Sequence, residues 1–229
     1  MFDLEDKSLK AVAVMRFEDR RDAGRALASL VATLPELKNA LVLALPRGGV
    51  PVAFEVARLL NLPLDILIVR KLGAPGMPEL ATGAIASGGI LVSNPDVLRS
   101  LHISDAALHA LARRELPELE RRERIYRCNL PSVAIDGRVI ILVDDGLATG
   151  ATMCSAARAV RPRASRVVIA VPVAAESSLR KLESEADQIF CVSTPESFEA
   201  VGQYYSNFEP TSDEEVCTLL KQAWAWSHP

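Results

Sequence analysis

The feature that most constrains the fold is the segment at residues 139–152, which reads VIILVDDGLATGAT. Its first five residues are aliphatic without interruption, a pattern typical of a strand buried on both faces of a parallel sheet. Further apolar runs with helical patterns between them indicate more strands of the same sheet. The sequence therefore predicts an α/β fold in which helices flank a parallel, twisted sheet. These further runs lie at residues 41–45, 64–69, 166–171 and 188–192.

Two aspartates, Asp144 and Asp145, follow this strand at its carboxyl end, where open α/β sheets place their ligands. The next residues, 146–152, are rich in Gly, Ala and Thr, so the backbone can come close to a ligand. Free amides at the start of the following helix suit a phosphate. Carboxylates suit ribose hydroxyls or a magnesium ion. The segment predicts a site for a phosphorylated ribose; the alternative is a polar strand end that turns at Gly146.

Two earlier turns also carry residues suited to a phosphorylated ligand, and each follows a predicted strand. The first reads Pro-Arg-Gly-Gly at residues 46–49, where the glycines expose backbone amides and the arginine adds a planar donor fork. The second is the basic pair Arg70 and Lys71. Alone, each is a weak signal, because glycines often only turn the chain and surface cations are usually solvated. Their order along successive strands predicts that all three turns meet at one sheet edge.

The segment DDGLATGAT resembles the phosphoribosyl pyrophosphate (PRPP) binding motif of type I phosphoribosyltransferases, in which two acidic residues precede a loop ending in Thr-Gly. The resemblance implies that Asp144 and Asp145 are catalytic, facing the ribose hydroxyls directly or through magnesium and water. It implies that Arg70 and Lys71 also take part in catalysis. The implied 5-phosphate ligands are Ala148, Thr149, Gly150, Ala151 and Thr152. The implied pyrophosphate ligands are Arg47, Gly48, Gly49, Arg70 and Lys71.

The same resemblance implies an activity. A magnesium-dependent pentosyltransferase would transfer the ribose 5-phosphate group of PRPP to a nitrogen acceptor, a nucleobase in nucleotide salvage, and release pyrophosphate. Ala148 stands where hypoxanthine-guanine enzymes carry an aspartate, as in adenine enzymes, which disfavours a 6-oxopurine. The whole-chain pattern is similar to a bacterial group of phosphoribosyltransferases whose acceptor the motifs do not settle. Relatives in the family are commonly dimers, so we expect a homodimer.

Residues 72–89 are so rich in Gly, Pro and Ala that they predict a mobile flap, such as type I enzymes close over the transition state. This flap contains no Lys or Arg, although several family members use a basic residue there. Its only ionisable residue, Glu79, is a candidate acceptor contact or a solvated side chain. Two alternatives therefore stay open: a regulatory protein that binds PRPP or a nucleotide without catalysis, and a hydrolase or phosphorylase of a phosphorylated ribose.

The rest of the chain predicts a single domain over residues 1–225, with a small hood formed by about 94–130 and 193–225. A helix is expected after Ser104, with Pro117 breaking or kinking it. Aromatic residues concentrate near the end of the chain, where Phe198 is a candidate to stack on the acceptor or to pack in the core. The terminal Trp-Ser-His-Pro resembles the start of a streptavidin-binding tag, so 226–229 is a candidate tag remnant.

The composition indicates which kinds of partner and which cellular compartment to expect. With 229 residues, 49% of them hydrophobic, the chain can bury one substantial core. A net charge of −3 gives no broad attraction to nucleic acid or lipid, so we expect small-molecule partners, no nucleic acid and no membrane. The charged start and the lack of an apolar run of about 20 residues predict a cytoplasmic protein. Four dispersed cysteines predict neither a zinc site nor a disulfide framework.

Overall fold

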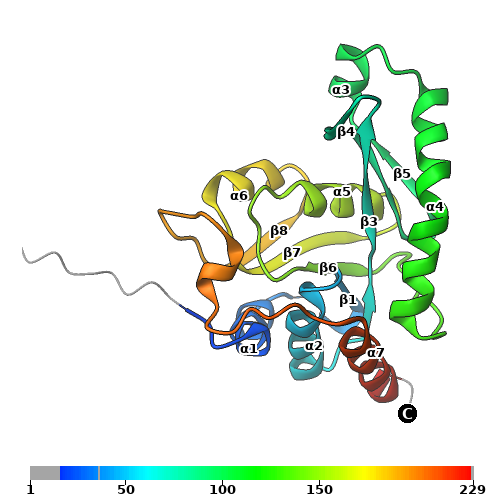
Figure 1. Cartoon of the computed structure of the whole chain (residues 1–229). Coiled ribbons are helices and arrows are strands. Elements are labelled where there is room, and N and C mark those ends of the chain that lie inside the picture. Colours follow the sequence, from blue (N-terminus) through cyan, green and yellow to red (C-terminus); the bar gives the residue numbers. More distant parts are fainter. Residues whose placement is uncertain (1–15, 36, 228–229) are drawn as a thin grey trace, which may run out of the picture.

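The computed structural model describes residues 16–35 and 37–227, and its centre is a five-stranded parallel sheet (Figure 1). All four strand pairs run parallel, as the unbroken aliphatic runs predicted. The fold class is therefore confirmed. The strands, in spatial order, are β2 (Leu64–Ile66), β1 (Ala40–Ala44), β6 (Val139–Val143), β7 (Arg166–Val173) and β8 (Gln188–Ser193).

The two central strands, β1 and β6, are buried along their whole length and pair in register from Ala40 with Val139 to Ala44 with Val143. Both strands therefore end at the same level of the sheet. The pairing continues one step further, since the amide of Leu45 donates to the carbonyl of Val143 at 2.8 Å. This register places the turn after β1 directly beside the turn after β6.

Helices cover both faces of the sheet (Figure 1). Alternate residues of β6 point to opposite sides: Ile141 packs with the residues of α1, α2 and α7, and Ile140 packs with those of α5. The alternation gives the sheet a buried core on each face. The bounds are α1 (Arg20–Val31), α2 (Gly49–Leu60) and α7 (Asp213–Ser227) on one face, and α5 (Ala151–Val160) and α6 (Glu176–Leu182) on the other.

A second, antiparallel sheet projects from the first (Figure 1). Two expectations for this part of the chain were wrong. It consists of β3 (Val69–Ala74), β4 (Met77–Ala86) and β5 (Ile90–Ser93), followed by α3 (Pro95–Ser100). The strand predicted over 64–69 ends at Ile66, and the loop predicted over 72–89 forms strands and a short 3-10 turn at Ser87–Gly89. The sheet is packed between α4 (Asp105–Arg127) and α5, and this tertiary burial overrides the turn-rich composition.

The long helix α4 forms much as expected at its start, but Pro117 does not break it (Figure 1). Ser104 is the N-cap, and its hydroxyl accepts the amide of Ala107 at 3.3 Å. The helix continues past the proline because Leu108 and Leu119, on either side of it, are both buried in the core. Neither α4 nor another helix of the described residues is both long and apolar enough to span a membrane.

A disulfide joins Cys128, at the end of α4, to Cys217 in α7, with Cα atoms 5.8 Å apart. The expectation of no disulfide was therefore wrong. Spacing could not reveal the pair, since its members lie 89 positions apart and meet only because α4 packs on α7. Cys154 and Cys191 are free thiols.

The last helix, α7, is held at both ends. The Ser212 hydroxyl accepts the amide of Glu215 at 3.1 Å, which is an N-cap bond. Near the other end, the indole of Trp226 packs on Phe54 with ring centroids 5.2 Å apart and donates to the carbonyl of Leu62 at 3.3 Å. Trp226, which the sequence placed in a candidate tag remnant, therefore takes part in the packing of α7.

Candidate active site

The turn at residues 46–49, called here the glycine turn, lies against the acidic doublet of Asp144 and Asp145. A Cβ atom added to Gly48 would lie 2.0 Å from Asp145 Oδ2, and one added to Gly49 would lie 2.9 Å from Asp144 Cα. Only a residue without a side chain allows this approach. The structure therefore brings the glycine turn and the acidic doublet together at one sheet edge.

Asp145 is fixed by two residues that the sequence did not identify. The Arg20 Nε atom lies 2.9 Å from Asp145 Oδ2, and the two side chains are only 11% and 15% exposed. The Tyr205 hydroxyl donates to the Asp145 carbonyl at 2.6 Å. The Arg20 guanidinium also stacks on the Phe208 ring at 3.9 Å and donates to the Glu209 carbonyl at 2.8 Å. No sequence signal linked these residues, because they meet only through the fold.

Asp144 and Asp145 interact electrostatically. Burial raises the pKa of Asp144 well above its ordinary value, and the neighbouring charge of Asp145 raises it further. Burial also raises the pKa of Asp145, although the Arg20 guanidinium opposes that shift. The doublet therefore resists carrying two negative charges by itself. A bound cation or hydroxyl donors would favour the ionised form.

The loop after the doublet leads into the amino terminus of α5. Gly150 has a φ of +71°, a conformation that favours glycine, and α5 begins at the next residue. Ala148, Thr149 and Ala151 are exposed. The Ser178 hydroxyl, which sequence reasoning missed, donates to the Ala148 carbonyl at 2.6 Å and holds the loop. Because the first amides of a helix lack intrahelical acceptors, this loop can bind an anion.

The three basic residues predicted to bind pyrophosphate lie in different surroundings. Arg47 is half-exposed and pairs with Asp213 of α7, with Nη1 3.3 Å from Oδ1. Arg70 pairs with Glu115 and lies 3.9 Å from Glu118, both on α4. It therefore lies within the second sheet, facing α4, rather than at the end of β2 as the sequence predicted. Lys71, the next residue of β3, is exposed.

The two candidate acceptor contacts occupy different surroundings. Glu79 lies exposed on β4 of the second sheet. Phe198 stacks on Tyr204, with ring centroids 5.4 Å apart and 20° between the planes, in a small cluster that also contains Phe17 and Tyr205. Phe198 therefore takes part in core packing, which was one of the two interpretations of this residue. A contact of either residue with an acceptor stays a prediction.

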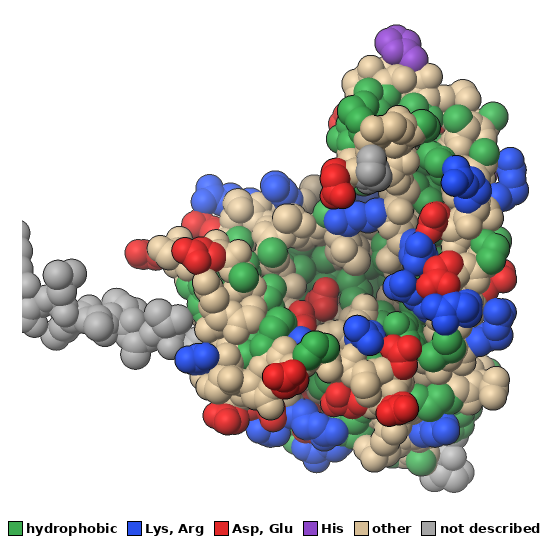
Figure 2. Space-filling view, in the orientation of Figure 1, with side chains coloured by type: hydrophobic (Ala, Val, Ile, Leu, Met, Phe, Trp, Pro, Cys, Tyr) green, Lys and Arg blue, Asp and Glu red, His purple; other side chains and the backbone are tan. Residues whose placement is uncertain are grey.

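The molecular surface is hollowed between the main sheet and the second sheet (Figure 2). Acidic side chains lie inside the hollow, and Lys and Arg side chains gather over α4 at its margin (Figure 2). Within residues 16–35 and 37–227, no group of three or more His, Cys, Asp or Glu side chains could enclose a metal. The doublet nonetheless fits magnesium, which commonly takes one or two carboxylates and completes its shell with substrate oxygens and water.

The fold and these turns define an α/β protein whose glycine turn and acidic doublet meet at the carboxyl ends of its parallel strands. The chain belongs to the phosphoribosyl transferase domain family, whose model matches residues 17–209. A Thermus thermophilus protein of known crystal structure is 46% identical with a TM-score of 0.83, covering 91% of this chain and 99% of that one.

Two Mycobacterium tuberculosis proteins, from strains CDC 1551 / Oshkosh and H37Rv, are provisionally named phosphoribosyl transferases. Each is 49% identical to this chain over 208 residues, which is 90% of this chain and 47% of the relative. The chain therefore spans about half the length of these curated relatives.

Proposed function

We propose that this protein transfers the ribose 5-phosphate group of PRPP to a nitrogen acceptor and releases pyrophosphate. The observation that carries the proposal is the contact between the glycine turn and the acidic doublet. In this family, these elements would hold the pyrophosphate and the ribose of one PRPP molecule. Their direct contact supports the proposal, because two elements this close can bind adjoining parts of the same ligand.

The proposed roles follow from the charges and donors of each element. Amides of residues 149–152 anchor the 5-phosphate, and the doublet orients the ribose ring through its hydroxyls. The amides of the glycine turn stabilise the departing pyrophosphate together with Arg47 and Lys71. Arg70 contributes as well if it releases its glutamate partners on α4 and binds the phosphate instead. Magnesium, held by Asp144 and Asp145 together with ligand oxygens and water, would supply further positive charge there. Positioning and electrostatics therefore carry most of the rate.

The direct test measures pyrophosphate release from PRPP and magnesium with a panel of purines, pyrimidines, simple amines and water. We expect release with a nitrogen acceptor and a loss of about 100-fold or more in the Asp144→Asn/Asp145→Asn variant. Adenine is the first acceptor to try, because Ala148 matches the adenine enzymes. Full activity in the double variant would overturn the mechanism, and release with water alone would point to a hydrolase.

A second candidate is a regulatory protein that binds PRPP without turnover. Two observations favour it: residues 72–89 contain no Lys or Arg, and Arg47 and Arg70 are both paired with carboxylates. Calorimetric titration with PRPP separates the two candidates. Tight binding that depends on the doublet, with no pyrophosphate released for any acceptor, would establish the regulatory role.

The proposal also includes a homodimer, as the family resemblance implies. Sedimentation velocity with and without PRPP measures the mass in solution directly. A monomer at all concentrations would remove the dimer from the proposal and leave the chemistry intact.

A further inference from the structure

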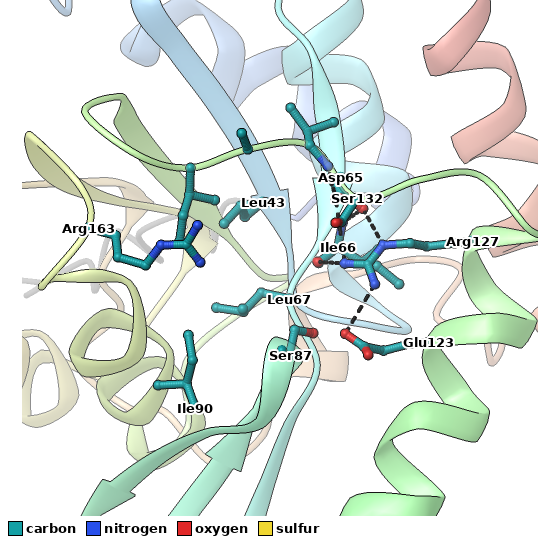
Figure 3. A pocket seen from close by; sticks show the side chains of 14 residues that line it. Leu43, Asp65, Ile66, Leu67, Ser87, Ile90, Glu123, Arg127, Ser132 and Arg163 are labelled. Carbon is teal, nitrogen blue, oxygen red and sulfur yellow. Dashed lines mark hydrogen bonds and ion pairs between the residues drawn. The ribbon is translucent and has the colours of Figure 1, made fainter.

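A cavity of about 340 Å³ lies apart from the motif turns (Figure 3). None of residues 46–49 or 144–152 lines it. Its walls include residues 132–135, which precede β6, and Arg163, which follows α5. It therefore extends toward the amino-terminal end of β6, whereas the acidic doublet follows the carboxyl end of the same strand.

The cavity exists because helices cover one face of the main sheet unevenly. On this face α5 packs on β6, β7 and the second sheet. Over β1 and β2, the cover comes instead from the irregular segment 132–135 and the turn at residues 87–90. These segments leave Leu43 and Leu67, both buried side chains of the core on this face, at the floor of the cavity.

One end of the cavity is a charged network centred on Arg127 (Figure 3). Arg127 donates from Nε to Asp65 at 2.9 Å, from Nη1 to Glu123 Oε1 at 3.1 Å and from Nη2 to the Ile66 carbonyl at 3.1 Å. Asp65 also accepts the amides of Ile66 and Val133, at 2.7 and 2.9 Å. Arg127 and Asp65 are thus fully engaged, while Glu123 uses one oxygen.

This end of the cavity carries an excess of one negative charge, because Asp65 and Glu123 face the single cation Arg127. Arg163, on another side of the cavity in Figure 3, does not offset the excess, since Asp136 balances it through hydrogen bonds of 2.8 and 2.6 Å. The polar end therefore favours a group that is positively charged or rich in N–H donors.

Ser87 adds a second recognition group at the same end. Its oxygen accepts the amide of Ile68 at 2.9 Å, which leaves the hydroxyl proton to donate to a ligand. Figure 3 shows Ser87 and Glu123 both toward the Arg127 end, with Leu67 and Ile90 along the rest of the cavity. An N–H donor facing Glu123 and an acceptor facing Ser87 would satisfy both groups.

We propose that this cavity is a second ligand site, which binds a small amino-substituted nitrogen heteroaromatic. The flat ring packs on Leu43, Leu67 and Ile90, its amino group donates to Glu123, and its ring nitrogen accepts from Ser87. The site is separate from the one proposed for PRPP and does not depend on phosphoribosyl transfer.

The test uses neutral 2-aminopyridine as the probe and benzoate, which has a similar size but carries a carboxylate in place of the amino donor, as its control. Titration of the full chain, followed by protein NMR or calorimetry, should give a Kd on the order of 1 mM for 2-aminopyridine. Benzoate should bind at least about tenfold more weakly, since a carboxylate next to Glu123 is repelled. Equal affinities, or no binding of 2-aminopyridine at this order of concentration, would overturn the proposal.

Variants locate the site. Glu123→Gln keeps an oxygen for Arg127 and removes the charge, so binding should weaken by about tenfold. Ser87→Ala should weaken it as well. Glu120→Gln, an exposed change on the same helix, is the matched control and should leave the affinity unchanged. Asp144→Asn/Asp145→Asn should also leave it unchanged, and loss of binding in that variant would assign the probe to the PRPP-type site and refute a second one.

Discussion

Arg20 and Asp145 lie 125 positions apart in the sequence and form a largely buried ion pair, with Nε 2.9 Å from Oδ2. The pair ties the first turn of α1 to the acidic doublet. The two carboxylates of the doublet therefore have different partners. Asp145 is held by Arg20, whereas the Asp144 carboxylate accepts the amide of Asp145 at 2.9 Å. The start of the described chain thus sets the position of a predicted catalytic carboxylate.

Arg20→Met should therefore destabilise the protein by about 3 kcal/mol, because it leaves the Asp145 carboxylate buried without its cation. Urea unfolding measures the change. Arg25→Met is the matched control on the same helix: its pair with Asp22 is exposed, so a loss below about 1 kcal/mol is expected. Equal effects of the two substitutions would contradict a special role for the buried pair.

The raised pKa of Asp144 predicts how stability varies with pH. A carboxyl whose pKa is higher in the folded than in the unfolded state contributes stability that is complete below the unfolded value, 3.8. That contribution is lost as the pH rises through the folded value. Between pH 3.8 and the raised folded pKa of Asp144, the free energy of unfolding of the wild type should therefore fall more steeply with pH than that of Asp144→Asn.

Urea unfolding at a series of pH values gives this comparison, and magnesium provides a further check. Since magnesium favours the ionised doublet, adding it should flatten the decline in the wild type and change the Asn variant less. Parallel curves for the two proteins would show that Asp144 titrates normally.

Gly48→Ala should disrupt the contact between the glycine turn and the doublet, because the new Cβ would meet Asp145 Oδ2 at 2.0 Å. We expect a loss of about 1–3 kcal/mol from overpacking. In Asp145→Ala the opposing carboxylate is absent, so the same change at position 48 should cost less. A double-mutant cycle by chemical unfolding measures this coupling, and strictly additive losses would refute the contact.

The disulfide between Cys128 and Cys217 predicts two titratable thiols, not four, when the oxidised protein is denatured. Reduction, or Cys128→Ser, should lower stability by about 2–4 kcal/mol, because the unfolded chain regains freedom. Thermal melting with and without reductant measures the loss. Cys191→Ser, which removes a free thiol and keeps the disulfide, is the control. Reductant should lower its melting temperature as much as that of the wild type.

The parallel sheet could be predicted from the sequence because its strands are buried on both faces and appear as unbroken aliphatic runs. The glycine turn and the acidic doublet could also be related in advance. Both follow neighbouring parallel strands, and β1 and β6 end in register. Local sequence sufficed wherever the sheet alone determined the position of a residue.

Other features depend on contacts between distant segments and left no local signal. Residues 69–93 carry turn-forming residues yet form strands, because that sheet packs on α4 and α5 and buries Leu72 and residues 82–86 there. For the same reason Arg70 faces the glutamates of α4. Neither the pairing of Arg20 with Asp145 nor the disulfide follows a spacing rule, since each joins elements that only tertiary packing brings together.

The bond between Cys128 and Cys217 closes a covalent ring around the segment that carries the acidic doublet and the phosphate loop. A protease that cuts once inside this ring would leave both fragments attached to each other. The nicked molecule would migrate at full mass on a non-reducing gel and separate only when a thiol is added.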